Sequence, residues 1–85
     1  YRDGQNPYFW NSIGILYFEI KQFGDSLDSF TKAININSSI SEIWWNLGLL
    51  YENCNKQISD AIDCYQKALE LYPKNLIILS RIQYL

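Results

Sequence analysis

The sequence predicts an all-α fold, a solenoid of antiparallel helical hairpins with about two and a half repeats. Three residue types recur at an offset of 34 in the 85-residue chain: Trp10 and Trp44, Gly14 and Gly48, Tyr17 and Tyr51. Within each copy these positions lie three, four or seven residues apart, which places them on one face of an α-helix. A fixed period of this length is typical of stacked helical units.

The recurring glycines indicate where the two helices of each hairpin approach most closely. A glycine inside a helix costs about 1 kcal/mol relative to alanine. Its presence at the same register in both copies therefore suggests that a side chain would clash there. We expect Ala33 and Ala68 to be the small residues that fill the facing groove.

These positions follow the tetratricopeptide-repeat pattern W-x2-L-G-x2-Y…A-x3-F…P, so the chain resembles that family. After the turn the offset becomes 35, from Phe30 to Tyr65 and from Ala33 to Ala68. One extra residue is therefore expected between Cys54 and Ser59, in the turn of the second hairpin.

Capping residues and helix breakers predict the element boundaries. Asn6 suits an N-cap and Pro7 the first helical position, whereas Ser39 and Glu42 form a capping-box pattern. A short turn is expected over residues 21–24, and Pro73 ends the fourth helix. The five predicted helices cover about residues 7–20, 25–36, 40–53, 58–71 and 76–85.

The same boundaries divide the chain into four segments. Residues 1–6 are the end of a preceding repeat or a linker, 7–40 a first repeat, and 41–75 a second repeat with the one-residue turn insertion. Residues 76–85 are a capping helix or the start of a third repeat. The chain begins at Tyr1 and contains no methionine, which predicts a segment of a longer protein with neighbouring repeats upstream.

Composition argues against several function classes. The net charge is −2 and the seven basic residues are scattered, so no direct nucleic-acid contact is expected. No apolar run approaches the roughly 20 residues that span a bilayer. There is no histidine and there are two cysteines, which disfavours a metal site. Without a phosphate-binding loop or a nucleophile beside a base, we expect no enzyme, no catalytic residue, no cofactor and no small-molecule substrate.

The first helix of each repeat lines the concave side of such solenoids, which predicts a groove for partner proteins. Matching the family's groove positions gives Tyr8, Asn11, Ile15, Phe18, Glu42, Trp45, Asn46, Leu49 and Glu52. The apolar members form a stripe that suits an amphipathic helix or an extended peptide. Alternatively, the protein's own repeats cover it, and the segment is a structural spacer. Asn46 and Arg81 match the carboxylate clamp of chaperone-binding members, but its lysine is missing, so chaperone-tail binding is not expected.

Longer runs resemble the tetratricopeptide subunits of fungal general transcriptional corepressors: residues 6–14 (NPYFWNSIG), 40–44, 47–55 and 57–63. This resemblance implies a nuclear adaptor, with the cytoplasm as a second location, that bridges DNA-binding transcription regulators to a WD40-type corepressor subunit. The repeats of UTX-type histone demethylases share much of it and are the second resemblance. The sequence departs at Ser26, Asn35 and Ser38, where the corepressor family often has alanine, a basic residue and proline.

Overall fold

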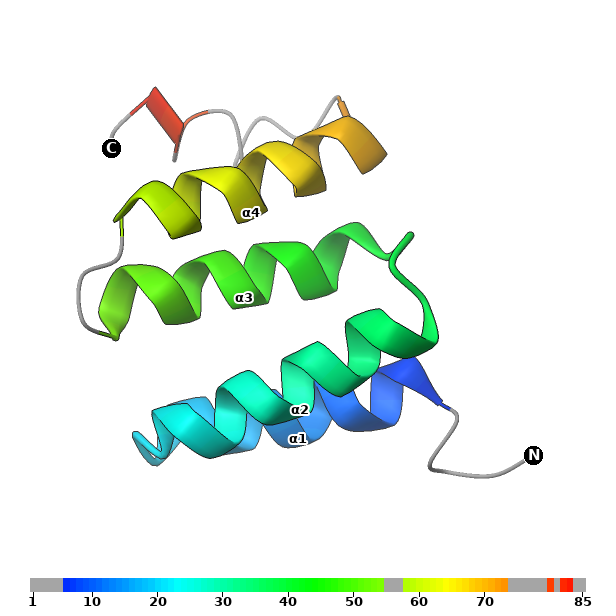
Figure 1. The fold of residues 1–85 in the computed structure, drawn as a ribbon, viewed down its shortest axis with the longest axis vertical. Helices are drawn as coiled ribbons and strands as arrows, with labels where there is room; N and C mark the ends of the chain where they lie inside the picture. Colours follow the sequence, from blue (N-terminus) through cyan, green and yellow to red (C-terminus); the bar gives the residue numbers. More distant parts are fainter. Residues whose placement is uncertain (1–5, 55–57, 74–79, 81, 84–85) are drawn as a thin grey trace. The chain divides into compact units, whose positions relative to one another are not determined.

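The computed structural model describes residues 6–54, 58–73, 80, 82 and 83. Four helices lie in this part of the chain: α1 (Pro7–Glu19), α2 (Phe23–Ile36), α3 (Ser41–Asn53) and α4 (Ile58–Leu71). The chain separates into two units at residues 39 and 40. In the first hairpin α1 packs antiparallel to α2, and in the second α3 packs antiparallel to α4 (Figure 1). The predicted all-α repeat fold is confirmed.

The start of α1 is the predicted one. The Asn6 side chain accepts a hydrogen bond from the Tyr8 backbone N–H at 3.0 Å. Pro7 occupies the first helical position, where its missing N–H leaves no hydrogen bond unmade. An N-cap of this kind stabilises a helix by about 1 kcal/mol.

The turn between α1 and α2 differs from the prediction. Phe23 and Gly24 belong to α2 rather than to the turn, and Lys21 adopts the left-handed conformation, with φ of 63°. The Gln22 N–H donates to the Tyr17 carbonyl at 2.8 Å, and the Lys21 N–H donates to the Phe18 carbonyl at 3.0 Å. This pair of bonds is the Schellman motif, which usually places glycine where lysine stands here.

The prediction that Ser39 and Glu42 form a capping box at the start of α3 is wrong. The N-cap is Ile40, and it makes no side-chain capping bond. Asn37 accepts from the Ser39 N–H at 2.9 Å, which forms a local turn before the helix. Ser41 reaches across the second hairpin instead, where its hydroxyl donates to the Ala68 carbonyl of α4 at 3.0 Å.

Both recurring glycines mark close helix approach, as predicted, but aromatic rings stand opposite them. A Cβ built on Gly14 would lie 2.5 Å from a ring carbon of Phe30, and one on Gly48 would lie 2.5 Å from a ring carbon of Tyr65. Phe30 and Tyr65 are fully buried. Ala33 and Ala68 are buried too, one turn further along α2 and α4.

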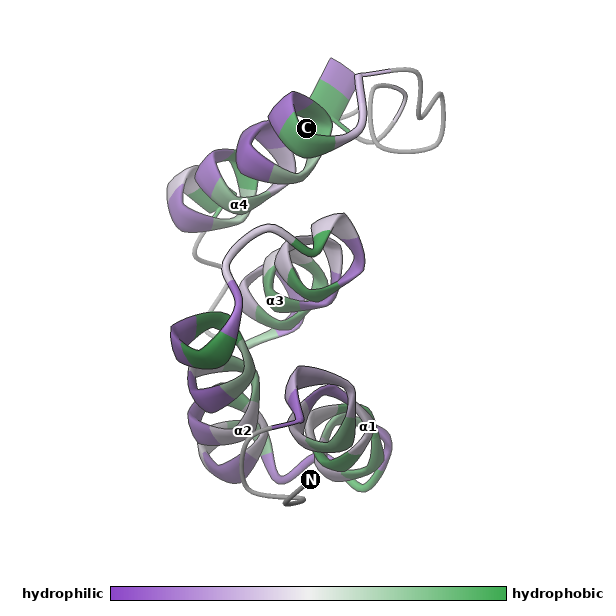
Figure 2. Cartoon of the chain, turned by 90° about the vertical axis from the view of Figure 1, so that its right-hand side faces the viewer, coloured by the Kyte–Doolittle hydropathy of each residue, from purple (hydrophilic) through white to green (hydrophobic). Residues whose placement is uncertain are grey.

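The second hairpin has a core of Ala61, Tyr65 and Ala68, against which partly buried apolar side chains pack, including Ile82. Figure 2 shows hydrophilic residues along one side of α2 and of α4. Three residues separate α1 from α2, and four separate α3 from α4, so the extra residue lies between Asn53 and Ile58. Most of the predicted helix over 76–85 and most of that turn lie outside the described residues.

Candidate functional site

The predicted groove residues of α1 have unequal exposure. Tyr8 is 56% exposed, whereas Asn11 is 3% exposed and therefore buried. Ile15 and Phe18 are half-buried. The Phe18 ring meets the Phe23 ring edge-to-face, with centroids 5.8 Å apart. Tyr8 is thus the groove residue of α1 that is most available to a partner.

The predicted groove residues of α3 also contact their own hairpin. The Trp45 ring lies 5.0 Å from the Tyr65 ring, and both Trp45 and Leu49 pack against the core of the second hairpin. The Tyr65 hydroxyl donates to a Glu52 carboxylate oxygen at 2.8 Å. Asn46 is half-buried and Glu42 is exposed. These contacts hold Trp45, Leu49 and Glu52 in place, so a partner would meet a preorganised surface.

A second apolar surface on α1 was not predicted. Phe9 and Leu16 share one side of this helix, and Ile20 is its C-cap; they are 37%, 58% and 57% exposed. Thirty-four residues later Ile43 and Leu50 take the positions of Phe9 and Leu16, and they are 0% and 2% exposed. The helical spacing of residues 9, 16 and 20 could have revealed this surface.

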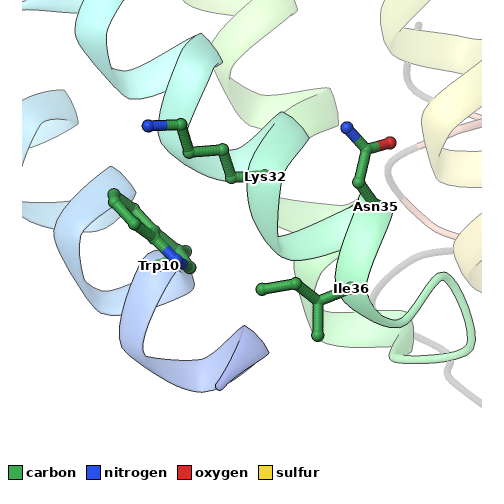
Figure 3. A pocket seen from close by; sticks show the side chains of 4 residues that line it. All are labelled: Trp10, Lys32, Asn35 and Ile36. Carbon is green, nitrogen blue, oxygen red and sulfur yellow. The ribbon is translucent and has the colours of Figure 1, made fainter. Parts of the chain in front are cut away.

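An open pocket of about 360 Å³ lies at one end of the first hairpin, and it too was not predicted. Its lining residues are Trp10 of α1 and Lys32, Asn35 and Ile36 of α2 (Figure 3). The Lys32 ammonium lies 4.4 Å from the centroid of the Trp10 ring. Such a cation–π contact contributes about 0.5–1 kcal/mol at an exposed site.

Two ionisable groups of the second hairpin have shifted pKa values. Burial, assisted by Asp60 and Asp63, raises the pKa of the Cys64 thiol to about 12. Burial also raises the pKa of Tyr51, with smaller contributions from Cys64 and Asp60. A thiol held in its neutral form is a poor nucleophile and a poor metal ligand. Cys54 and Cys64 are both free thiols rather than a disulfide.

The described part of the chain offers neither a metal-binding cluster nor a membrane-spanning helix. No group of three or more cysteine and acidic residues there could hold a metal ion. No helix among the described residues combines the length and apolarity needed to cross a membrane.

Comparison with known families identifies the class. Family models described as "Tetratricopeptide repeat" match residues 7–40 and 41–75. Together these matches include both described hairpins, so the chain belongs to the tetratricopeptide-repeat family. Repeats of this class present surfaces to other proteins, and the chain is accordingly a protein–protein interaction scaffold.

Several characterised proteins are similar in sequence. The peroxisomal targeting signal receptor of Kluyveromyces lactis is 34% identical over 61 residues, which cover 72% of this chain and 11% of the receptor. Anaphase-promoting complex subunit 6 of Arabidopsis thaliana is 30% identical over 84 residues, which cover 93% of this chain and 15% of that subunit. The chain therefore spans only a small part of these relatives.

Two solved structures share the fold. The crystal structure of MamA matches with a TM-score of 0.87 and 22% identity, over 93% of this chain and 46% of that one. The first tetratricopeptide-repeat domain of Spaghetti (RPAP3), bound to the HSP90 peptide SRMEEVD, matches with a TM-score of 0.86 and 22% identity. That match covers 94% of this chain and 63% of the other. At this identity the likeness concerns the fold alone.

Proposed function

We propose that this chain is the peptide-binding part of a nuclear transcriptional corepressor adaptor, without catalytic activity of its own. In this proposal the predicted groove faces of α1 and α3 bind peptide or helical segments of partner proteins. The partners are a WD40-type corepressor subunit and DNA-binding transcription regulators. The corepressor part rests on the matching runs at residues 6–14, 40–44, 47–55 and 57–63. The peroxisomal receptor and the anaphase-promoting complex subunit are not transcriptional corepressors, so they do not support this part of the proposal.

The exposure of Tyr8 carries the binding part of the proposal. This aromatic side chain is 56% exposed at a groove position, on a helix held in place by its own cap and by the packing of Gly14 against Phe30. Tyrosine is enriched among the residues that dominate binding energy at protein interfaces. In the second hairpin, the half-buried Trp45 and Leu49 are the apolar side chains at the predicted groove positions of α3.

A pull-down from nuclear extract tests this function, with bound proteins identified by mass spectrometry. The variant is Tyr8→Glu, which places a charge in the groove. The matched control is Leu16→Glu, because Leu16 is similarly exposed at 58% but lies on another side of α1. We expect Tyr8→Glu to lower the recovery of both partner classes about tenfold, and Leu16→Glu to leave it unchanged.

Other outcomes decide against parts of the proposal. Unchanged recovery with Tyr8→Glu would move the binding surface away from the groove face, and equal loss with both variants would mean that binding is not confined to that face. Recovery of a histone demethylase complex would favour the repeat region of a UTX-type enzyme, the second candidate, which shares much of the same sequence. Recovery of neither partner class by the native chain would favour a structural spacer. Circular dichroism of each variant shows whether its helices are intact.

A further inference from the structure

We propose that the pocket formed by Trp10, Lys32, Asn35 and Ile36 is a second binding site, for an acidic peptide side chain with an apolar neighbour. It does not depend on the groove proposed above, because none of its four residues belongs to the predicted groove. The pocket also offers a different set of chemical groups: one cation, one amide and two apolar surfaces.

The pocket brings these groups together from both helices of the first hairpin. Trp10 projects from the first part of α1, and the other three residues lie in the last two turns of α2 (Figure 3). The volume of about 360 Å³ is near the lower end of the range for ligand pockets. A site of this size suits one or two peptide side chains.

The matching end of the second hairpin shows what the first hairpin lacks. With the offset of 35, Lys67 corresponds to Lys32 and Glu70 corresponds to Asn35. Lys67 pairs with Glu70, with a nitrogen-to-oxygen distance of 3.9 Å. The first hairpin has an amide in place of that carboxylate, and Lys32 lies over the Trp10 ring instead. An incoming carboxylate would therefore restore the charge pair that the second hairpin makes internally.

The surroundings of Lys32 are compatible with an acidic ligand. The first turn of α1, which carries Trp10, contains no acidic residue. On α2 the nearest acidic position is Asp28, one turn before Lys32. A bound carboxylate can accept a hydrogen bond from the exposed Lys32 ammonium. The exposed Asn35 amide points away from the Lys32 nitrogen in Figure 3, so its side chain would have to turn to reach the same ligand. An adjacent leucine side chain can cover the apolar surfaces of Trp10 and Ile36.

Nuclear magnetic resonance of the tryptophan side chains tests this site in the 85-residue chain. The three tryptophans give three indole N–H signals, and the signal that Trp10→Phe removes belongs to Trp10. The probes are the blocked peptides acetyl-Gly-Glu-Leu-Gly-amide and acetyl-Gly-Gln-Leu-Gly-amide. We expect the glutamate peptide to shift the Trp10 signal, with saturation at about millimolar concentration, because exposed charge pairs are weak. The glutamine peptide should leave it in place.

Three variants identify the groups responsible. Lys32→Gln removes the cation, and Asn35→Glu supplies an internal carboxylate as in the second hairpin. Each should weaken binding of the glutamate peptide about fivefold. The matched control Lys67→Gln changes the corresponding lysine of the second hairpin and should leave the affinity unchanged. Retained amide spectra establish that each variant is folded.

Any of three results would overturn the inference. An equal response to the glutamine peptide would mean that the pocket does not select a carboxylate. Undiminished binding by Lys32→Gln would exclude the ammonium as the recognising group. A shift of either other tryptophan signal as large as that of Trp10 would show that the peptide does not distinguish the two hairpins, because Trp44 and Trp45 both lie in the second.

Discussion

The two hairpins share one contact and differ in the polar bonds around it. In both, a glycine of the first helix packs against an aromatic ring of the second, with the same 2.5 Å separation from a built Cβ. In the first hairpin the buried Ser26 hydroxyl donates to the Gly14 carbonyl at 2.7 Å. Its counterpart in the second is Ala61, which has no hydroxyl. Repetition thus preserves the shape of the helix contact and leaves its hydrogen bonds free to vary.

At the aromatic ring, the second hairpin has the polar bond and the first hairpin lacks it. The second hairpin has Tyr65, whose hydroxyl is bonded to Glu52. The first has Phe30 in place of the tyrosine and Phe18 in place of the glutamate. The Ser26–Gly14 bond therefore belongs to the first hairpin, whereas the Tyr65–Glu52 bond and the Ser41–Ala68 bond belong to the second. Ser26 is also one of the positions that departs from the corepressor pattern, and its bond to Gly14 gives that departure a structural role.

The largest expected difference in stability between the two hairpins arises when a leucine at the same register of each is replaced by alanine. Leu50→Ala should lower the free energy of unfolding by about 2–5 kcal/mol, because Leu50 is 2% exposed. Leu16→Ala, at the same register of the first hairpin, should change it by at most about 0.5 kcal/mol, because Leu16 is 58% exposed. Urea denaturation measures both. Equal losses would mean that the Phe9, Leu16 and Ile20 surface is covered in solution.

The glycine contact should be the next most sensitive feature. Gly14→Ala and Gly48→Ala each force a methyl group against a buried ring, which costs about 1–3 kcal/mol and outweighs the roughly 1 kcal/mol gained in helix propensity. Gly24→Ala is the control, because no atom lies within 4 Å of a Cβ built there. It should leave stability unchanged or raise it. Thermal unfolding followed by circular dichroism ranks the three, and a stable Gly48→Ala would contradict the close approach.

Removing the ring hydroxyl from the second hairpin, or adding one to the first, should have a smaller effect on stability. Tyr65→Phe removes the bond to Glu52 and should cost about 1 kcal/mol. Phe30→Tyr adds a hydroxyl at a buried position where Phe18 replaces the glutamate, so it should also destabilise the chain. The double variant with Phe18→Glu should recover part of that loss in a double-mutant cycle. No recovery would mean that the first hairpin cannot reproduce the bond.

The smallest expected effect on stability at neutral pH comes from substituting Cys64, which is the counterpart of Ser29 in the second hairpin. Its pKa is raised from 9.0 to about 12 because the thiol is buried. Between these values the unfolded chain loses the thiol proton and the folded chain keeps it, so stability should fall as pH rises through this window. Cys64→Ala should show a shallower fall over the same range. At pH 8 an alkylating reagent should modify Cys54 before Cys64, and the reverse order would contradict the burial of Cys64.

Local chemistry made most of the helices predictable. The cap at Asn6, the proline at residue 7 and the apolar periodicity gave boundaries for α1 close to the observed ones, and α4 has the predicted bounds. Two predictions failed at the helix ends. The turn predicted over residues 21–24 is shorter because α2 begins at Phe23, and Lys21 takes the left-handed position because the bonds of the Schellman motif depend on where α1 ends. The predicted cap at Ser39 is wrong because the N-cap of α3 is Ile40, and Ser41 bonds to α4 instead of to its own helix end.

The sequence by itself determined the repeat class, the hairpin order and the close approach at both glycines. Tertiary structure decided which side chains stand opposite one another. It placed the rings of Phe30 and Tyr65 against the glycines, and Lys32 over Trp10. It also left Leu16 exposed and Leu50 buried. The reason is that periodicity specifies the direction in which a side chain leaves its own helix. What that side chain meets depends on the elements packed around it.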